Sequence, residues 1–403
     1  MSCAAGTAAT LSILVRAMRI LHVLDRADVI GGVQTYLADL IPALAARGIE
    51  SSVACGTEGV VGGAAVDVVV GVAADGRSIA NETVARLTAV VEDRRPDLAV
   101  QHVAMSPGVT RALRDVEVPV VVHAHDYFMT CPGGARYLHT SATFCSEGHG
   151  ARCFWRAYTE RTTNRRPDRL LRAYRRTEAW GDTWPLIRRL LVASEFVADV
   201  HAARGVPEDL LRVVGYPVQA PAASLAADDG ADVLFVGRLI DAKGVHVLLD
   251  ALAALPGVTA LIAGDGPARG ALESKAHELG LGERVRFEGW ISPERRSSLF
   301  GGSKLLALPS LWDEPFGIVG VEALGAGLPV VGSDAGGVSS WLDDGTTGTL
   351  VPRGDAVALA GAIDALLSQD DLRERYSSAA PSTLTRYTME RHLELLLPAL
   401  GIA

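Results

Sequence analysis

The segment with the richest chemistry is PSLWDEPFGIVGVEA, at residues 309–323. It follows Leu305–Leu308, an apolar run typical of a buried strand. Pro315 and Gly317 favour the start of a helix directly afterwards. The first backbone N–H groups of that helix would have no partner inside it, and such groups bind an anion such as phosphate. These donors are the amides of Phe316, Gly317, Ile318 and Val319.

Two carboxylates of this segment, Glu314 and Glu322, stand eight positions apart. We expect Glu314 in the loop before the helix and Glu322 in its second turn, so that both face one ligand at two points along its length. A carboxylate accepts strong hydrogen bonds from sugar and ribose hydroxyls. For an isolated acidic pair, complementing the helix dipole would be the simpler interpretation. The other loops in this half of the chain favour the interpretation that the two carboxylates bind a ligand.

Four further loops in the same half of the chain follow strand-like runs and are rich in glycine or charge. GRL-x4-KG carries Arg238 and Lys243, which either neutralise a diphosphate leaving group or are simply solvated cations. GDGP begins at Gly264, in a tight turn where the backbone can approach a ligand. FEGW ends at Trp290, which would lie against a nucleobase, and SDAGGV occupies residues 333–338. All five loops are expected at one edge of a sheet.

The elements that must position these loops alternate between short apolar strands and helices. Strands are predicted at 20–24, 98–102 and 118–123, and the pattern restarts at Val233–Val236. Val-rich strands that alternate with helices indicate parallel sheets covered on both faces. The predicted fold class is therefore α/β, with two Rossmann-like, doubly wound domains facing across a cleft. Ligands bind such sheets at the carboxyl ends of the strands.

Composition narrows the classes of function. With 403 residues, the chain should form about two domains. A net charge of −9 disfavours nucleic acid as a partner. No run approaches about 20 apolar residues, so we expect no transmembrane helix and a cytoplasmic protein. Five cysteines are too few for a disulfide scaffold.

The ordered set GRL-x4-KG, GDGP, F-x-GW, PS-x3-EPFG-x4-E and SDAGGV resembles the family 4 retaining glycosyltransferases, which have the GT-B fold. The resemblance implies that Glu322 holds the ribose of a nucleotide and that Glu314 lies near the donor sugar. It also implies that Arg238 and Lys243 grip the diphosphate, while the amides at the helix start contact sugar and phosphate. Residues 339–340 are Ser-Ser, where many members of the family have Pro-Glu.

The first half of the chain agrees with this resemblance. Gly31 and Gly32 resemble the family's Gly-Gly loop near the donor phosphates, although two glycines alone would predict only a turn. A strand then leads into His123 and His125. His125 matches the active-site histidine of the family, which would hydrogen-bond the donor sugar and help to shape the acceptor side. His123 is expected to pack beside it.

The expected domain boundaries combine the strand pattern with the resemblance. Residues 1–17, ahead of a second methionine at Met18, are expected to form a disordered leader and lack the features of a signal peptide. The other predicted units are an acceptor-binding domain at 18–219, a linker at 220–232, a donor-binding domain at 233–384 and a C-terminal helix at 385–403 that crosses back to the first domain.

An insertion at 131–184 interrupts the first domain. Three cysteines and a histidine in it either form a tetrahedral zinc site or leave unpaired thiols or a disulfide. These residues are Cys131, Cys145, His149 and Cys153. The arginine-rich part, 152–176, is either a solvated helix face or a contact for an anionic membrane surface, an acidic acceptor or a partner protein.

The resemblance predicts a retaining, metal-independent hexosyltransferase that uses a UDP- or GDP-sugar, with UDP-GlcNAc as the first donor to test. The sugar would pass to a hydroxyl of an envelope glycan, a glycolipid or a small-molecule natural product. The nucleotide sugar would be a co-substrate, and no cofactor would be required. The expected catalytic residues are His125, Glu314, Arg238 and Lys243. Two alternatives stay open: a GT-B sugar-nucleotide epimerase, and a non-catalytic partner subunit that binds nucleotide sugars.

Overall fold

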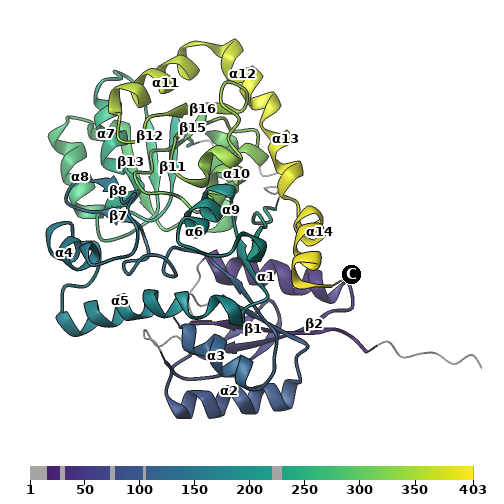
Figure 1. Ribbon diagram of the computed structural model, residues 1–403. Coiled ribbons are helices and arrows are strands. Elements are labelled where there is room, and N and C mark those ends of the chain that lie inside the picture. Colours follow the sequence, from purple (N-terminus) through teal and green to yellow (C-terminus); the bar gives the residue numbers. More distant parts are fainter. Residues whose placement is uncertain (1–15, 28–31, 73–77, 103–105, 220–228, 403) are drawn as a thin grey trace, which may run out of the picture.

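The computed structural model describes residues 16–27, 32–72, 78–102, 106–219 and 229–402. They form two lobes, each built on a largely parallel sheet with helices packed against it (Figure 1). Most of the expected leader, all of the linker before residue 229, and Gly31 lie outside the described residues. The guanidinium of Arg16, at the end of the expected leader, hydrogen-bonds the Asp97 carboxylate at 3.3 Å.

The sheet of the first lobe has eight strands, and only β3 runs antiparallel to its neighbour. In sheet order the strands are β10 (Leu211–Val213), β9 (Arg189–Val192), β6 (Val120–His123), β5 (Leu98–Gln101), β1 (Arg19–Leu24), β2 (Glu50–Cys55), β4 (Ala64–Val68) and β3 (Val60–Val61). The helices are α1 (Gly32–Ala45), α2 (Asn81–Arg94), α3 (Pro107–Asp115), α4 (Arg152–Thr159), α5 (Pro167–Gly181) and α6 (Glu195–Ala202), with short 3-10 turns at Trp184–Leu186 and Glu208–Leu210.

The sheet of the second lobe has six strands, all parallel. Their order is β13 (Val285–Gly289), β12 (Ala260–Ala263), β11 (Val233–Val236), β14 (Leu305–Leu308), β15 (Val330–Ser333) and β16 (Gly348–Val351). The helices are α7 (Val245–Ala253), α8 (Arg269–Glu278), α9 (Pro293–Gly302), α10 (Ile318–Gly325), α11 (Ala356–Ser368), α12 (Asp370–Ala379), α13 (Pro381–Leu384) and α14 (Met389–Leu400). Short 3-10 turns lie at Asp241–Lys243, Gly282–Arg284, Gly337–Ser340 and Thr385–Tyr387.

The strands form because their apolar runs can be buried on both faces of a sheet. In β1, Ile20 and Leu24 belong to one hydrophobic cluster, whereas Leu21 and Val23 belong to another on the opposite face. This division follows from the period of two residues along a strand. The predicted α/β class with two doubly wound sheets is therefore correct.

The two lobes meet through loops that follow strands of both sheets. Ser194, two residues after β9, donates a hydrogen bond from its hydroxyl to the Pro315 carbonyl, in the loop after β14, at 2.8 Å. The rings of Tyr216 and Phe316 also meet edge to face, with their centroids 5.6 Å apart. Carboxyl-end loops of the two sheets thus face each other, which is where ligands of such folds bind.

Helix α14 returns to the first lobe and lies beside α1 (Figure 1). The Tyr36 hydroxyl and the His392 ring nitrogen Nε2 are 3.0 Å apart and join the two helices. The opposite connection comes from the insertion in the first lobe. Its hairpin, β7 (Tyr137–Leu138) and β8 (Thr143–Phe144), lies against the second lobe, and Tyr137 is buried in the core of that lobe.

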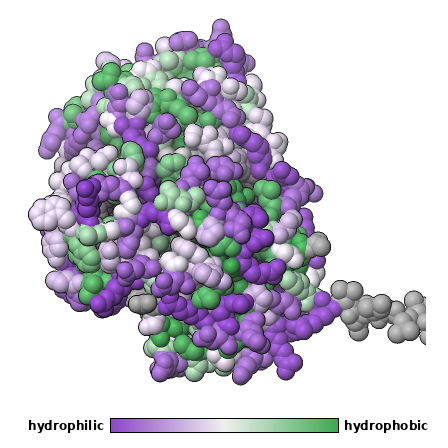
Figure 2. Space-filling model, in the orientation of Figure 1, coloured by the Kyte–Doolittle hydropathy of each residue, from purple (hydrophilic) through white to green (hydrophobic). Residues whose placement is uncertain are grey.

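The surface is mixed in polarity. On the face drawn in Figure 2, hydrophilic residues spread over both lobes and hydrophobic residues form small patches between them. None of the helices among the described residues is long and apolar enough to span a bilayer.

Candidate active site

Lys243 and Glu314 form an ion pair where two loops of the second lobe meet. The Lys243 ammonium lies 2.7 Å from a carboxylate oxygen of Glu314. Glu314 is only 3% exposed, and the same oxygen accepts a hydrogen bond from the Ser310 hydroxyl. Lys243 ends the turn after β11, whereas Glu314 lies in the loop between β14 and α10. Two residues from separate sequence motifs therefore share one buried contact.

Backbone packing holds these two loops together. Gly244 has a φ of +69°, and a Cβ at this position would collide with the Pro309 carbonyl oxygen. The amide of Leu311 donates a hydrogen bond to the Ala242 carbonyl at 2.9 Å. Because only glycine combines a left-handed φ with so close an approach, Gly244 fixes Lys243 beside the loop that carries Glu314.

Glu322 has a different cation partner. It lies in the second turn of α10, and its carboxylate is 2.9 Å from the guanidinium of Arg296 on α9. Burial raises the pKa of the Glu322 carboxyl, and Arg296 opposes that rise. The sequence did not single out Arg296, because a cation on a helix without a motif looks like any solvated arginine. Each carboxylate of the predicted pair is thus already balanced by its own cation.

Helix α10 begins at Ile318, so of the two residues expected to open it, Gly317 directly precedes the first turn, whereas Pro315 lies in the loop and that part of the expectation is wrong. Gly317 precedes the helix with a φ of +89°, which separates Phe316 from the first turn. Phe316 is buried, and its carbonyl accepts a hydrogen bond from the Trp341 indole. The amides of Ile318 and Val319 lie in the first turn, where the helix provides no backbone acceptor. The anion-binding end of α10 is therefore shorter than the four-amide set that the sequence predicted.

The remaining predicted donor-side residues differ in their surroundings. Arg238 is exposed, and Trp290 is 70% exposed directly after β13. A Cβ at Gly264 would collide with the Gly237 carbonyl oxygen, so packing of the neighbouring loop already requires that glycine. Gly32 begins α1, and a Cβ there would have no atom within 4 Å. At Gly32, the space beside the backbone is open.

The first lobe contributes a chain of hydrogen-bonded rings rather than ion pairs. His22 Nδ1 lies 3.2 Å from His102 Nε2, and His102 Nδ1 lies 2.9 Å from His125 Nε2. His125 Nδ1 in turn contacts the Tyr216 hydroxyl. Tyr36 packs edge-on or tilted against the rings of His102, His125 and Tyr216. The sequence predicted His125 but missed its ring partners, which come from distant parts of the chain.

Burial keeps these imidazoles neutral. It lowers the pKa of His125 to about 3 and that of His22 to about 4, and it lowers the pKa of His102 well below its ordinary value. Both ring nitrogens of His125 are already engaged, by His102 and by Tyr216. A hydrogen bond from the His125 ring to a donor sugar, as the resemblance implies, would have to replace one of these contacts.

Two family models match consecutive parts of the chain. One, described as Glycosyltransferase Family 4, matches residues 30–219, and the other, described as Glycosyl transferases group 1, matches residues 219–383. Their common boundary coincides with the start of the predicted linker. The chain belongs to glycosyltransferase family 4. The resemblance found in the motifs is thereby confirmed.

Characterised relatives of this family 4 glycosyltransferase match it over part of its length. A phosphatidyl-myo-inositol mannosyltransferase of Mycobacterium leprae is 41% identical over 39% of this chain and 43% of its own. An alpha-D-kanosaminyltransferase of Streptomyces kanamyceticus is 38% identical over 40% of this chain and 43% of its own. A 2-deoxystreptamine N-acetyl-D-glucosaminyltransferase of Streptomyces fradiae is 32% identical over 54% and 52%. The chain spans about half the length of the curated relatives it matches.

Solved structures match the whole fold. HepE of Anabaena, in complex with UDP, superposes with a TM-score of 0.73 at 21% identity and covers 95% of this chain and 100% of its own. WaaG, a glycosyltransferase involved in lipopolysaccharide biosynthesis, superposes with a TM-score of 0.67 at 19% identity and covers 95% and 99%. The predicted GT-B fold is confirmed by these matches.

In this glycosyltransferase, Asp313 links the two lobes next to Glu314. Its carboxylate lies 2.8 Å from the Arg353 guanidinium and 3.7 Å from that of Arg136, which belongs to the insertion of the first lobe. Asp313 is only 1% exposed. The sequence motifs did not single out Asp313, although its position directly before Glu314 in a strand-end loop was a signal that could have marked it.

The cysteines of the insertion carry free thiols and do not gather as metal ligands. Cys145 lies 2.8 Å from the Arg156 guanidinium, and the His149 ring packs against Tyr174. Neither thiol of Cys131 or Cys153 is in a disulfide. Within the described part of the chain, the only group of three or more potential metal ligands lies elsewhere, in the first lobe. Of the alternatives left open, the structure has free thiols and not a disulfide, and a zinc site at these four residues stays a prediction.

Proposed function

We propose that this chain is a retaining glycosyltransferase that moves a sugar from a UDP-linked donor to a hydroxyl of an acceptor. The observation that carries the proposal is the ion pair of Lys243 and Glu314 at the carboxyl edge of the second sheet. An ammonium group has three N–H donors, and among the described residues Lys243 donates a hydrogen bond only to Glu314. Lys243 can therefore also donate to a phosphate oxygen while Glu314 holds it in place.

The chemistry proposed for the site is electrostatic. Breaking the bond between sugar and phosphate places negative charge on the departing diphosphate. Lys243, the exposed Arg238 and the first amides of α10 would stabilise that charge, because fixed donors gain strength where water is excluded. Glu322 would accept hydrogen bonds from the ribose, and Glu314 would lie near the sugar. The first lobe, with Gly32 and His125, would close over the donor and orient the acceptor hydroxyl.

The donor and acceptor are proposed from relatives. HepE was solved with UDP and with UDP-glucose, and one relative is named for N-acetyl-D-glucosaminyl transfer. UDP-GlcNAc is therefore the donor to test first, followed by UDP-glucose. Several relatives are named for inositol, inositol phosphate or 2-deoxystreptamine, which are all ring polyols. A cyclitol, free or lipid-linked, is the acceptor class to test first.

A peripheral membrane contact is part of the proposal. Helices α4 and α5 expose Trp155, Tyr158 and Leu171 beside several exposed arginines. Aromatic side chains among cations suit the surface of an anionic bilayer. Co-sedimentation with anionic vesicles, compared with neutral ones, tests this contact.

The test of the function combines binding with turnover. A bound donor stabilises the folded state, by about 2.7 kcal/mol at 100 times its Kd, so the correct nucleotide sugar gives the largest thermal shift in a panel. With that donor and cyclitol acceptors, release of the nucleoside diphosphate and formation of the glycoside are measured. An epimerised donor formed without acceptor would instead identify an epimerase, and binding without any turnover a partner subunit.

Two substitutions test the site. Lys243→Ala should lower kcat about 100-fold or more, the typical loss when one preorganised electrostatic donor is removed. Glu322→Ala should mainly raise KM for the donor, by about tenfold, because it removes a charge-assisted hydrogen bond. Lys275→Ala is the matched control, since Lys275 also pairs with a carboxylate, Asp250, at 2.7 Å on the outside of the same lobe. Equal activity of Lys243→Ala and Lys275→Ala would refute the site.

A further inference from the structure

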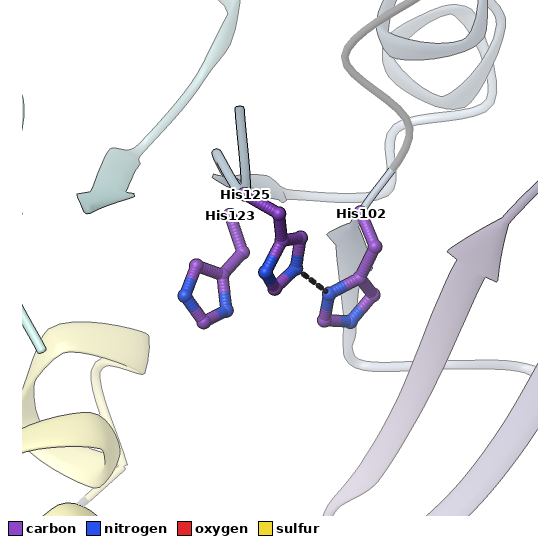
Figure 3. Close-up of side chains that lie close together, drawn as sticks. All are labelled: His102, His123 and His125. Atoms are coloured by element: carbon purple, nitrogen blue, oxygen red, sulfur yellow. Dashed lines mark hydrogen bonds between the residues drawn. The ribbon is translucent and has the colours of Figure 1, made fainter. Parts of the chain in front are cut away.

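Three histidines meet at the carboxyl ends of two neighbouring strands of the first lobe. His123 ends β6, and His125 follows two residues later. His102 directly follows β5, which pairs with β6 in parallel register. Figure 3 shows the three rings side by side, with His125 between the other two. Each histidine offers one ring nitrogen, and these three nitrogens all lie within 4.8 Å of one another. Among the described residues, no other group of three or more potential metal ligands lies so close together.

His123 has an unexplained place in this group. Its side chain is 0% exposed, and neither of its ring nitrogens has a hydrogen-bond partner among the described residues. Leaving a buried polar group unpaired costs about 1–3 kcal/mol, so such groups usually have a reason to be kept. The neighbouring Tyr36 does not supply the partner, since its ring meets His123 edge to face and its hydroxyl bonds His392. The position therefore holds an unused nitrogen that points into a group of imidazoles.

The other two rings are held from outside, as metal-binding histidines usually are. His102 contacts His22 through Nε2, and His125 contacts Tyr216 through Nδ1. Such outer contacts fix the tautomer and orientation of a ligand ring. The facing nitrogens, His102 Nδ1 and His125 Nε2, are 2.9 Å apart. Two imidazole ligands of a tetrahedral zinc ion, with Zn–N of about 2.0 Å, would be about 3.3 Å apart, so the rings need to separate only slightly.

We propose that His102, His123 and His125 form a binding site for a divalent first-row transition metal ion, with Zn²⁺ as the ion that fits best. Three neutral imidazoles suit zinc, cobalt or nickel, whereas magnesium and calcium prefer oxygen ligands. The ion would lie between the rings of His102 and His125, and the proton between them would move to the outer nitrogen of its own ring, which faces His22 or the Tyr216 hydroxyl, so that both rings stay neutral. A free nitrogen of His123 would be the third ligand. His125 is partly exposed, so the ion enters from its side.

The site rests on these three imidazoles and not on the proposed glycosyl transfer. It does bear on that proposal through His125, because one nitrogen cannot hold a metal ion and a sugar hydroxyl at the same time. Metal binding at this place would thus compete with any donor contact made through His125 Nε2.

The experiment uses the full chain, stripped of metal with a chelator and then loaded. Zn²⁺ content after desalting, measured by elemental analysis, should reach about one ion per chain, and Co²⁺ should develop the visible absorption of a tetrahedral site. His123→Gln should lose this ion, with a fall in affinity beyond the ~10–100-fold that outer-contact mutations cost. His277→Gln, at an exposed position of α8, is the matched control and should bind normally. Thermal unfolding establishes whether each variant is folded. If His123→Gln does not fold, His102→Gln takes its place in the same measurements.

Two results would overturn the inference. One is a wild-type chain that retains no stoichiometric Zn²⁺. The other is an ion that His123→Gln keeps but that Cys145→Ser loses, which would place it in the insertion. Transfer measured on the metal-free chain separates the two proposals, because activity without metal binding removes only this inference, and metal binding without activity removes only the proposed function.

Discussion

The two lobes carry opposite kinds of side chain where their carboxyl-end loops face each other. On the second lobe, Asp313 and Glu314 are buried carboxylates and Glu322 is a partly buried one, and each lies within 3 Å of a cation. On the first lobe, the corresponding strand ends carry histidines and tyrosines that are joined ring to ring, without a salt bridge between them. On the second lobe each charge is balanced by an ion pair, whereas on the first lobe burial keeps the imidazoles neutral.

This difference agrees with what we propose that each lobe binds. A nucleotide diphosphate is a dianion or more, so the lobe that binds it needs cations, and buried cations need carboxylates to hold them until the ligand arrives. A hydroxyl acceptor and the sugar are neutral and need oriented donors and acceptors instead. Neutral imidazoles supply both without a counter-ion. Three measurements can break or sharpen this contrast between paired charge and neutral rings.

The largest effect is expected at the link between the lobes. Asp313→Ala leaves the Arg136 and Arg353 guanidinium groups without their shared partner, and it should lower the free energy of unfolding by about 3 kcal/mol, the low end for a broken buried pair because Arg353 is partly exposed. Urea denaturation measures the change. Asp250→Ala, which breaks a more exposed pair with Lys275, is the control and should cost about 0.5 kcal/mol. Equal losses in both variants would remove the special role of paired charge between the lobes.

The next largest effect is expected when the pH is lowered, because the buried histidines of the first lobe then change the free energy of unfolding. Burial holds the pKa of His22 at about 4 and that of His125 at about 3, below the ordinary value of 6.5. The unfolded chain therefore binds more protons than the folded chain below about pH 6.5, and the free energy of unfolding falls as the pH falls through this window. Each pKa unit of depression is worth about 1.4 kcal/mol, which gives about 3 kcal/mol for His22 over the whole window.

Asp126 acts in the opposite sense, because burial raises its pKa to about 6 from 3.8, and the raised pKa values of Asp39 and Glu322 act in the same direction as that of Asp126. The pKa values of His22, His102, His123 and His125 are all lowered, so the histidines decide the sign. Urea midpoints at about pH 7 and about pH 5 measure the net effect. His22→Gln should make the loss between these pH values smaller, whereas the exposed His277→Gln should leave it as in the wild type. Stability that stays flat down to about pH 4 would show that these rings are not held neutral.

The smallest effect is expected for a single neutral hydrogen bond. Tyr36→Phe removes the contact with His392 that joins α1 to α14 and should cost about 1 kcal/mol, the usual net value of one such bond. The same denaturation series measures it. A loss as large as that of Asp313→Ala would mean that the ring network is as strong as the ion pairs, and the contrast between the lobes would then fail.

Much of the second lobe was predictable because its signals are local. Strand, loop and helix follow one another within about fifteen residues. Each predicted site residue could therefore be assigned either to the loop after a strand, as for Arg238, Lys243 and Glu314, or to the helix that follows that loop, as for Glu322. The same locality failed at the helix start. Pro315 has the residue type of a first helical position, but Gly317 adopts a left-handed φ and delays α10 to Ile318.

The amino-acid sequence by itself determined the fold class, the family and the edge of each sheet where chemistry gathers, because apolar periodicity and loop motifs are properties of neighbouring residues. Only the tertiary structure decided the partners: Arg296 for Glu322, Arg136 for Asp313, and His102 and Tyr216 for His125. These contacts join residues that lie between 23 positions apart, for His102 and His125, and 177 positions apart, for Arg136 and Asp313. Nothing in a local pattern encodes them, since the packing of strands and lobes alone sets which charges and rings come within hydrogen-bonding distance.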